Sequence, residues 1–173
     1  MIKKFNHTGA VARFMKKPWQ YQQLVMEAFL WIAITRFIIR FLPFKALLFL
    51  IGTKPEPESG QATNIDYMEL IKNSSETEVQ PGPVVTDITN AVKSVSRRVP
   101  WQSKCLVQAA SAKRMMNRRK IENQLFLGVS ASGLKGDGPT KRLNIHSHAW
   151  LVADHNVVLG GENLEDFIAV SRF

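Results

Sequence analysis

One cysteine and one histidine are the residues of this sequence best suited to nucleophilic chemistry. Cys105 is the only cysteine, and it follows Pro100, which ends one helix, and Ser103, which is a good N-cap for the next. The spacing predicts that Cys105 is the second residue of a helix, where the positive end of the helix dipole favours a thiolate. His148 lies in a later apolar run that predicts a strand, and an imidazole beside a thiol is the usual base for such a nucleophile.

The start of the cysteine helix could also stabilise negative charge on a substrate. The backbone amide of Cys105 would be one of the donors that have no partner within the helix. It would form one arm of an oxyanion hole, with the indole of Trp101 or the side-chain amide of Gln102 as the second arm. The plainer interpretation is that a lone cysteine is a small buried apolar residue. Its place in a first helical turn after a proline favours the chemical interpretation.

Four short motifs surround these two residues in a fixed order. They are PWxSKCLVQA at 100–109, AKRM at 112–115, LFLGV at 125–129 and HAWL at 148–151. Together they resemble the leader peptidases of lasso-peptide biosynthesis, which are similar to the C-terminal domain of microcin-processing proteins. The resemblance covers about residues 84–173 and, more loosely, 24–52. Lys120 stands where that family usually has a glycine, and the stretch 131–145 is longer than usual.

The resemblance implies an α+β fold of the papain and transglutaminase type, in which a helix bearing Cys105 packs on an antiparallel sheet bearing His148. It also implies a Cys-His-acid peptidase that cleaves the leader from a ribosomal precursor peptide, beside a leader-binding partner protein and a lasso cyclase. Two other classes stay open. A transglutaminase-like transferase would pass the same acyl group to an amine, and a non-catalytic partner- or membrane-binding protein would have an inert thiol.

The third member of the site is open among three residues. Asp154 is the nearest acid after His148, but six residues along one strand span roughly 20 Å, which is too far to orient an imidazole. A three-residue turn at 154–156 would place Glu162 opposite His148, and we favour this arrangement. A two-residue turn at 155–156 would place Asn163 there instead.

No metal or cofactor is expected. His146, His148 and His155 could supply nitrogen ligands, but the chain has one cysteine and no His-Glu-x-x-His spacing. The absence of a second cysteine excludes an internal disulfide and fits a reducing compartment, so we expect a cytoplasmic protein.

Charge is distributed unevenly along the 173 residues, whose net charge is +9. Residues 1–45 carry eight Lys and Arg against Glu27 alone, and 93–120 carry nine with no acid. Such a basic run could indicate nucleic-acid binding, but a basic helix end is usually a solvated face, and we do not expect nucleic acid as a partner.

The first segment, 1–52, is expected to be a basic arm followed by an amphipathic helical hairpin, with helices at 19–42 and 44–51. Arg36 and Arg40 interrupt its apolar runs, which argues against a helix that spans the membrane. The hairpin could pack on its own domain, attach peripherally to a membrane through residues 19–51, or dock on a partner protein. Of the two functional interpretations, we prefer that the hairpin docks on a partner protein.

The rest of the chain divides into an acidic linker rich in proline and glycine, 53–83, and a catalytic domain, 84–173. In that domain a helix capped by Thr86 should end at Pro100, and the cysteine helix should turn its alanines to the core and Lys113 outward. Strands are expected at three places, which are 124–129, 145–153 and 157–159.

Overall fold

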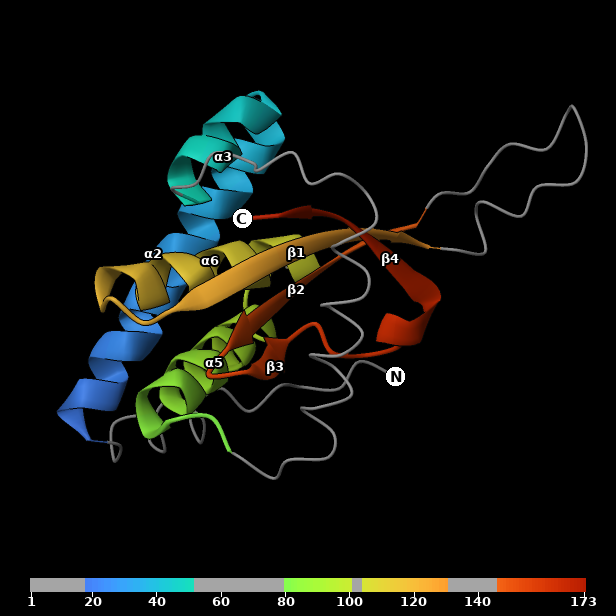
Figure 1. Ribbon diagram of the computed structural model, residues 1–173. Coiled ribbons are helices and arrows are strands. Elements are labelled where there is room, and N and C mark those ends of the chain that lie inside the picture. The colour runs from blue at the N-terminus through green and yellow to red at the C-terminus, as the bar shows by residue number, and fades with distance from the viewer. Residues whose placement is uncertain (1–17, 52–79, 101–103, 131–145) are drawn as a thin grey trace, which may run out of the picture.

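The computed structural model describes residues 18–51, 80–100, 104–130 and 146–173 (Figure 1). Within these ranges the chain forms four α-helices and one antiparallel sheet of four strands, in the order β3-β2-β1-β4. The expected α+β class is confirmed. The helices are α2 (Trp19–Phe41), α3 (Phe44–Ile51), α5 (Pro83–Ser96) and α6 (Cys105–Arg118). The strands are β1 (Asn123–Ser130), β2 (Ser147–Ala153), β3 (Asn156–Leu159) and β4 (Phe167–Arg172).

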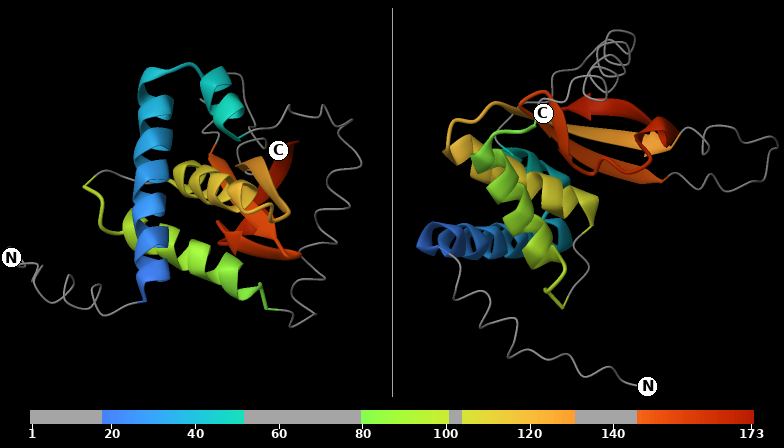
Figure 2. Two further views of the ribbon diagram at one scale, coloured as in Figure 1. Left: turned by 90° about the vertical axis from the view of Figure 1, so that its left-hand side faces the viewer. Right: turned by 90° about the horizontal axis from the view of Figure 1, so that it is seen from below.

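Helix α6 lies between the sheet and the N-terminal helices. It contacts β1 and β2 on one side, while α2 packs against α5 and α6 on the side away from the sheet (Figure 2). Ala109, Ala110 and Ala112 are fully buried in α6, and their small side chains let the backbones of neighbouring elements approach closely. The helix that carries the cysteine is therefore held from both sides.

The two faces of β2 have different neighbours. Ala149 and Leu151 belong to the main core beneath the helices. Trp150 and Val152 belong to a second apolar cluster with Phe126, Leu164 and Ala169. Side chains alternate between the faces of a strand, so His148 shares the face of Trp150, as the sequence predicted. Their rings lie 6.1 Å apart between centroids.

The hairpin between β2 and β3 differs from the predicted geometry. Its turn has two residues, Asp154 and His155, with φ angles of 49° and 61°, and Ala153 pairs with Asn156. Positive φ at both central residues is the type I′ turn, whose twist matches that of the strands it joins. The predicted three-residue turn at 154–156 and the alternative turn at 155–156 are both wrong. A register shift between Leu151 and Val152 then pairs Leu151 with Leu159.

Helix α5 begins earlier and ends earlier than predicted. Its N-cap is Gly82 and Pro83 is its first residue, because proline has the φ angle of a first helical turn and needs no hydrogen-bond partner there. The Thr86 hydroxyl does not cap the helix but donates to the carbonyl of Pro81 at 3.2 Å. The last residue of α5 is Ser96.

Lys113 is buried, although the sequence pattern pointed it to solvent. Its Nζ donates to the carbonyl of Phe173 at 3.0 Å and to the side-chain oxygen of Asn123 at 3.2 Å. These oxygens lie at the end of the chain and the start of β1, which cover that side of α6. Burial lowers the pKa of Lys113 from 10.5 to about 8, since charge is costly away from water.

The N-terminal hairpin packs on the domain with only one of its faces. Ala28, Ile32 and Thr35 are buried against the other helices. On the opposite face of α2, five large apolar side chains are exposed: Trp19, Met26, Leu30, Phe37 and Phe41. Among the helices of the described ranges, none combines the length and the apolar character that crossing a bilayer requires.

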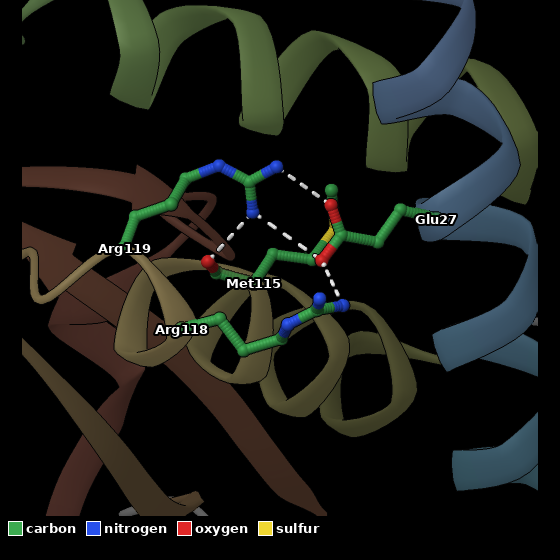
Figure 3. A network of polar contacts seen from close by, with 4 residues as sticks. All are labelled: Glu27, Met115, Arg118 and Arg119. Atoms are coloured by element: carbon green, nitrogen blue, oxygen red, sulfur yellow. Dashed lines mark hydrogen bonds and ion pairs between the residues drawn. The ribbon is translucent and has the colours of Figure 1, made fainter.

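An ion-pair network joins α2 to the C-terminal end of α6 (Figure 3). The carboxylate of Glu27 accepts hydrogen bonds from Arg119 at 2.6 and 3.3 Å and from Arg118 at 2.9 Å. Arg119 also donates to the carbonyl of Met115 at 2.9 Å, which fixes the guanidinium. Burial alone would raise the pKa of Glu27, but the two arginines outweigh it, and the pKa is lowered from 4.5.

Replacing Glu27 with Gln should lower the free energy of unfolding at pH 7 by about 1 kcal/mol. A lowered pKa means that the contribution is present above pH 4.5 and is lost as the pH falls through the folded-state value. Urea unfolding of wild type and variant from pH 7 to pH 3 would test this. The difference between their free energies of unfolding should become small at pH 3. Arg118→Gln is the control and should cost less than Arg119→Gln, because its side chain is 56% exposed against 32%. A difference that stays constant with pH would contradict the role of the charge.

Candidate functional site

Cys105 is the first residue of α6 and is half-buried. The residue before it, Lys104, is the N-cap, so the predicted start of this helix was one residue too early. The carbonyl of Lys104 accepts the amides of Val107 and Gln108 at 2.9 and 3.2 Å. The amides of Cys105 and Leu106 precede these bonds and have no partner within the helix, which makes them donors for an anion near the thiol. Ser103, Trp101 and Gln102 lie outside the described residues.

His148 is held by its surroundings in one orientation. Its Nε2 lies 2.9 Å from the carbonyl oxygen of Gly160. Because a carbonyl only accepts, Nε2 carries the proton and Nδ1 is the basic nitrogen. The ring also packs on Phe167, with 4.9 Å between centroids. A tautomer protonated at Nε2 leaves Nδ1 as the nitrogen that could accept a proton from a nucleophile, as a general base must.

The contact to His148 depends on glycine at position 160. Gly160 has a φ of +70°, which L side chains rarely adopt. A Cβ there would lie 2.3 Å from the carbonyl oxygen of Ala149 and 3.1 Å from Cα of Trp150. Only glycine can bring its carbonyl to the ring along this path.

Cys105 and His148 line the same cleft, which has a volume of about 460 Å³. One wall comes from the helices and includes Cys105, Gln108 and residues near the end of α5. The other wall includes His148 and the segment 157–162. Among the described residues no hydrogen bond joins the thiol to the imidazole. The two groups thus share one solvent-accessible space, into which a substrate could bring a carbonyl.

The three candidates for the acidic or amide member have different environments. Glu162 is exposed and lines the cleft. Asp154 lies in the β-turn, where its carboxylate accepts the amide of Gly82 at 2.9 Å and ties the hairpin to α5. Asn163 is exposed, with a φ of 53°. The choice of Glu162 stays a prediction, and the observed partner of Nε2 is a backbone carbonyl.

Sequence reasoning missed the carbonyl of Gly160 and the two cations of the cleft, Lys93 and Arg97. The pair Gly160-Gly161 at the end of a strand was the available signal, because paired glycines mark unusual backbone geometry.

Within the part of the chain that is described, no cluster of histidine, cysteine or acidic side chains could hold a metal ion.

A family model described as the transglutaminase-like superfamily matches residues 60–172. This match covers more than half of the chain and includes α5, α6 and the strands of the sheet. The chain belongs to the transglutaminase-like superfamily. Members of this superfamily are generally cysteine-dependent enzymes, and a helix carrying Cys105 packed on an antiparallel sheet is consistent with its core. No curated protein and no solved structure matches the chain significantly.

Substituting Gly160 with Ala should destabilise the protein by about 2 kcal/mol, from the positive φ angle and the contact with Ala149. Gly161→Ala is the matched control, because its Cβ would meet only the side chain of Val157, with Cγ1 at 3.3 Å and Cβ at 3.9 Å. Urea unfolding measures the stability, and the imidazole NMR signals of His148 report its tautomer. We expect the Nε2-protonated signals to change in Gly160→Ala alone. Equal stability of the two variants would contradict the requirement for glycine at position 160, on which the contact with His148 depends.

Proposed function

We propose that this protein is a cysteine peptidase that removes the leader from a ribosomal precursor peptide during lasso-peptide maturation. The observation that carries the proposal is the shared cleft, which is lined by the chain's only cysteine, at a helix start, and by His148 on the opposite wall. Membership of the transglutaminase-like superfamily supports cysteine chemistry of the peptidase or transferase type. The order of the four sequence motifs supports the narrower assignment.

In the proposed reaction, Nδ1 of His148 takes the proton of the Cys105 thiol, and the thiolate attacks the carbonyl carbon of the scissile bond. The oxyanion that forms accepts a hydrogen bond from the amide of Cys105. The intermediate collapses, the peptide C–N bond breaks, and the imidazolium returns its proton to the leaving amine. Water then attacks the thioester with His148 as base, which releases the new carboxyl terminus and restores the thiol.

The thiol and imidazole need no mutual hydrogen bond before substrate arrives. Catalytic hydrogen bonds are often long in the free enzyme and shorten in the complex. The carbonyl of Gly160 keeps the proton on Nε2 throughout and faces the positive charge of the imidazolium. Glu162, on the same wall of the cleft, would add a negative charge near that cation.

We further propose that the peptidase acts with a leader-binding partner and a lasso cyclase. The outer face of α2 is an apolar surface that no described element covers, which suits contact with another molecule. Transfer of the acyl group to an amine is the second candidate, since the superfamily supports both reactions and they share the thioester. The product mass separates them, because hydrolysis adds one water and transfer adds the amine.

Cys105→Ala and His148→Ala should each abolish cleavage of the precursor. The loss of Cys105 should cost only about 1 kcal/mol of stability, because the side chain is half-buried at a helix start. Mass spectrometry of the precursor, incubated with the enzyme and its partners, measures the activity, and circular dichroism checks the fold. Cleavage by Cys105→Ala at a rate near that of wild type would refute the proposal.

Among the three candidates for the third member, Glu162→Gln should slow cleavage without abolishing it. We expect a loss of about threefold, since Gly160 continues to orient the ring and the interaction of an exposed charge such as that of Glu162 is worth less than about 1 kcal/mol. Asn163→Ala should keep the wild-type rate. Asp154→Asn should lower stability rather than turnover, because its carboxylate holds Gly82. The three single-turnover rates, measured side by side, test this order, and a rate defect confined to Asp154→Asn would contradict it.

A further inference from the structure

Two cationic side chains at the C-terminal end of α5, Lys93 in its last turn and Arg97 at its C-cap, line the candidate cleft. Lys93 and Arg97 lie one helical turn apart, are exposed, and line the same space as Cys105. Neither belongs to the machinery described above. Both charges therefore lie on the helix wall of the cleft, which Cys105 also lines.

These two cations have no carboxylate partner within the described ranges. The neighbouring Arg98 is held instead by the carbonyl of Ser94, at 2.8 Å, and by its hydroxyl. Arg118 and Arg119 are held by Glu27. Lys93 and Arg97 form no such contact, and the ion pairs of the described residues do not include them. They are available to an incoming anion.

The other charges of the cleft do not cancel this positive wall. Glu162 is the only acidic side chain among the lining residues of the described segments, and it lies on the strand side. Charges of one sign that line a cleft raise the local concentration of ligands of the opposite sign. The volume of about 460 Å³ is in the range of sites that take a small ligand or a few residues of an extended peptide.

We propose that the cleft selects an acidic side chain of the substrate peptide, bound by Lys93 and Arg97 on the α5 side of the scissile bond. This inference rests on the proposed function and names the chemistry of its substrate. The carboxylate would accept hydrogen bonds from the guanidinium and the ammonium while Cys105 faces the peptide carbonyl. Because both cations are exposed, solvent screens them, and the gain is a few-fold in rate for each at low salt.

The single cysteine allows a test that needs no peptide substrate. Iodoacetate and iodoacetamide both alkylate a thiolate by displacing iodide, but only iodoacetate carries a carboxylate. Any effect of the cations on the reactivity of the thiolate itself acts on both reagents. The ratio of the two rate constants at Cys105 therefore isolates the attraction of the cleft for an anion.

We expect this ratio to fall by about three- to tenfold in the double variant Lys93→Gln, Arg97→Gln at low ionic strength. The difference should shrink in about 0.5 M salt, where charges are screened within a few ångströms. Arg98→Gln is the matched control. Arg98 is the neighbour of Arg97 and carries the same charge, but its side chain does not line the cleft. A ratio equal in the double variant and the wild type would overturn the proposal.

The same experiment separates this proposal from the proposed function. The iodoacetamide rate at neutral pH, compared with that of the urea-unfolded chain, reports whether the thiol is activated. A fast iodoacetamide reaction with a ratio that is the same in the wild type and the double variant would contradict the selection of anions but support an activated thiol. A slow iodoacetamide reaction with a ratio that falls in the double variant would support the selection of anions but contradict the peptidase function. In the peptide assay, replacing the acidic residues nearest the cleavage point with amides should slow the wild type but not the double variant.

Discussion

The arrangement of the site depends on how closely α6 can approach the sheet and α2 at once. Ala109, Ala110 and Ala112 are fully buried in this helix, and a larger side chain at any of them would push one layer away. The ion pairs of Glu27 join the other end of the helix to α2, while contacts with β1 and β2 hold it on the sheet. The position of Cys105 is thus a product of packing along the whole helix.

The helices and the first three strands could be predicted because their signals are local. Pro43 and Gly52 flank the helix predicted at 44–51, and period-two apolar residues predict the strand at 145–153. The strand β4 was missed, since Phe167–Arg172 follows a short 3₁₀ helix at Leu164–Asp166 and carries no clear alternation. What makes it a strand is its pairing with β1, which is a long-range contact that one segment cannot reveal.

The residues of the site were predictable to a different degree. Cys105 and His148 could be named as candidates from residue type and context, because few side chains perform that chemistry, and the structure places both on one cleft. The partner of Nε2 could not, since a backbone carbonyl carries no sequence signature and depends on the conformation of Gly160. Register arithmetic failed at the turn because it assumed uninterrupted pairing, whereas positive φ at Asp154 and a shift beside Val152 each moved the strand.

The outer face of α2 also governs how the isolated chain behaves in solution. The rings of Phe37 and Phe41 contact each other in a tilted arrangement, with 4.9 Å between centroids, and stay largely exposed to water. Two copies can hide these rings from water by joining through them, while the positive charges of Arg36 and Arg40 oppose that approach. Added salt screens the repulsion and leaves the apolar attraction, so we expect any self-association to grow with protein concentration and ionic strength together.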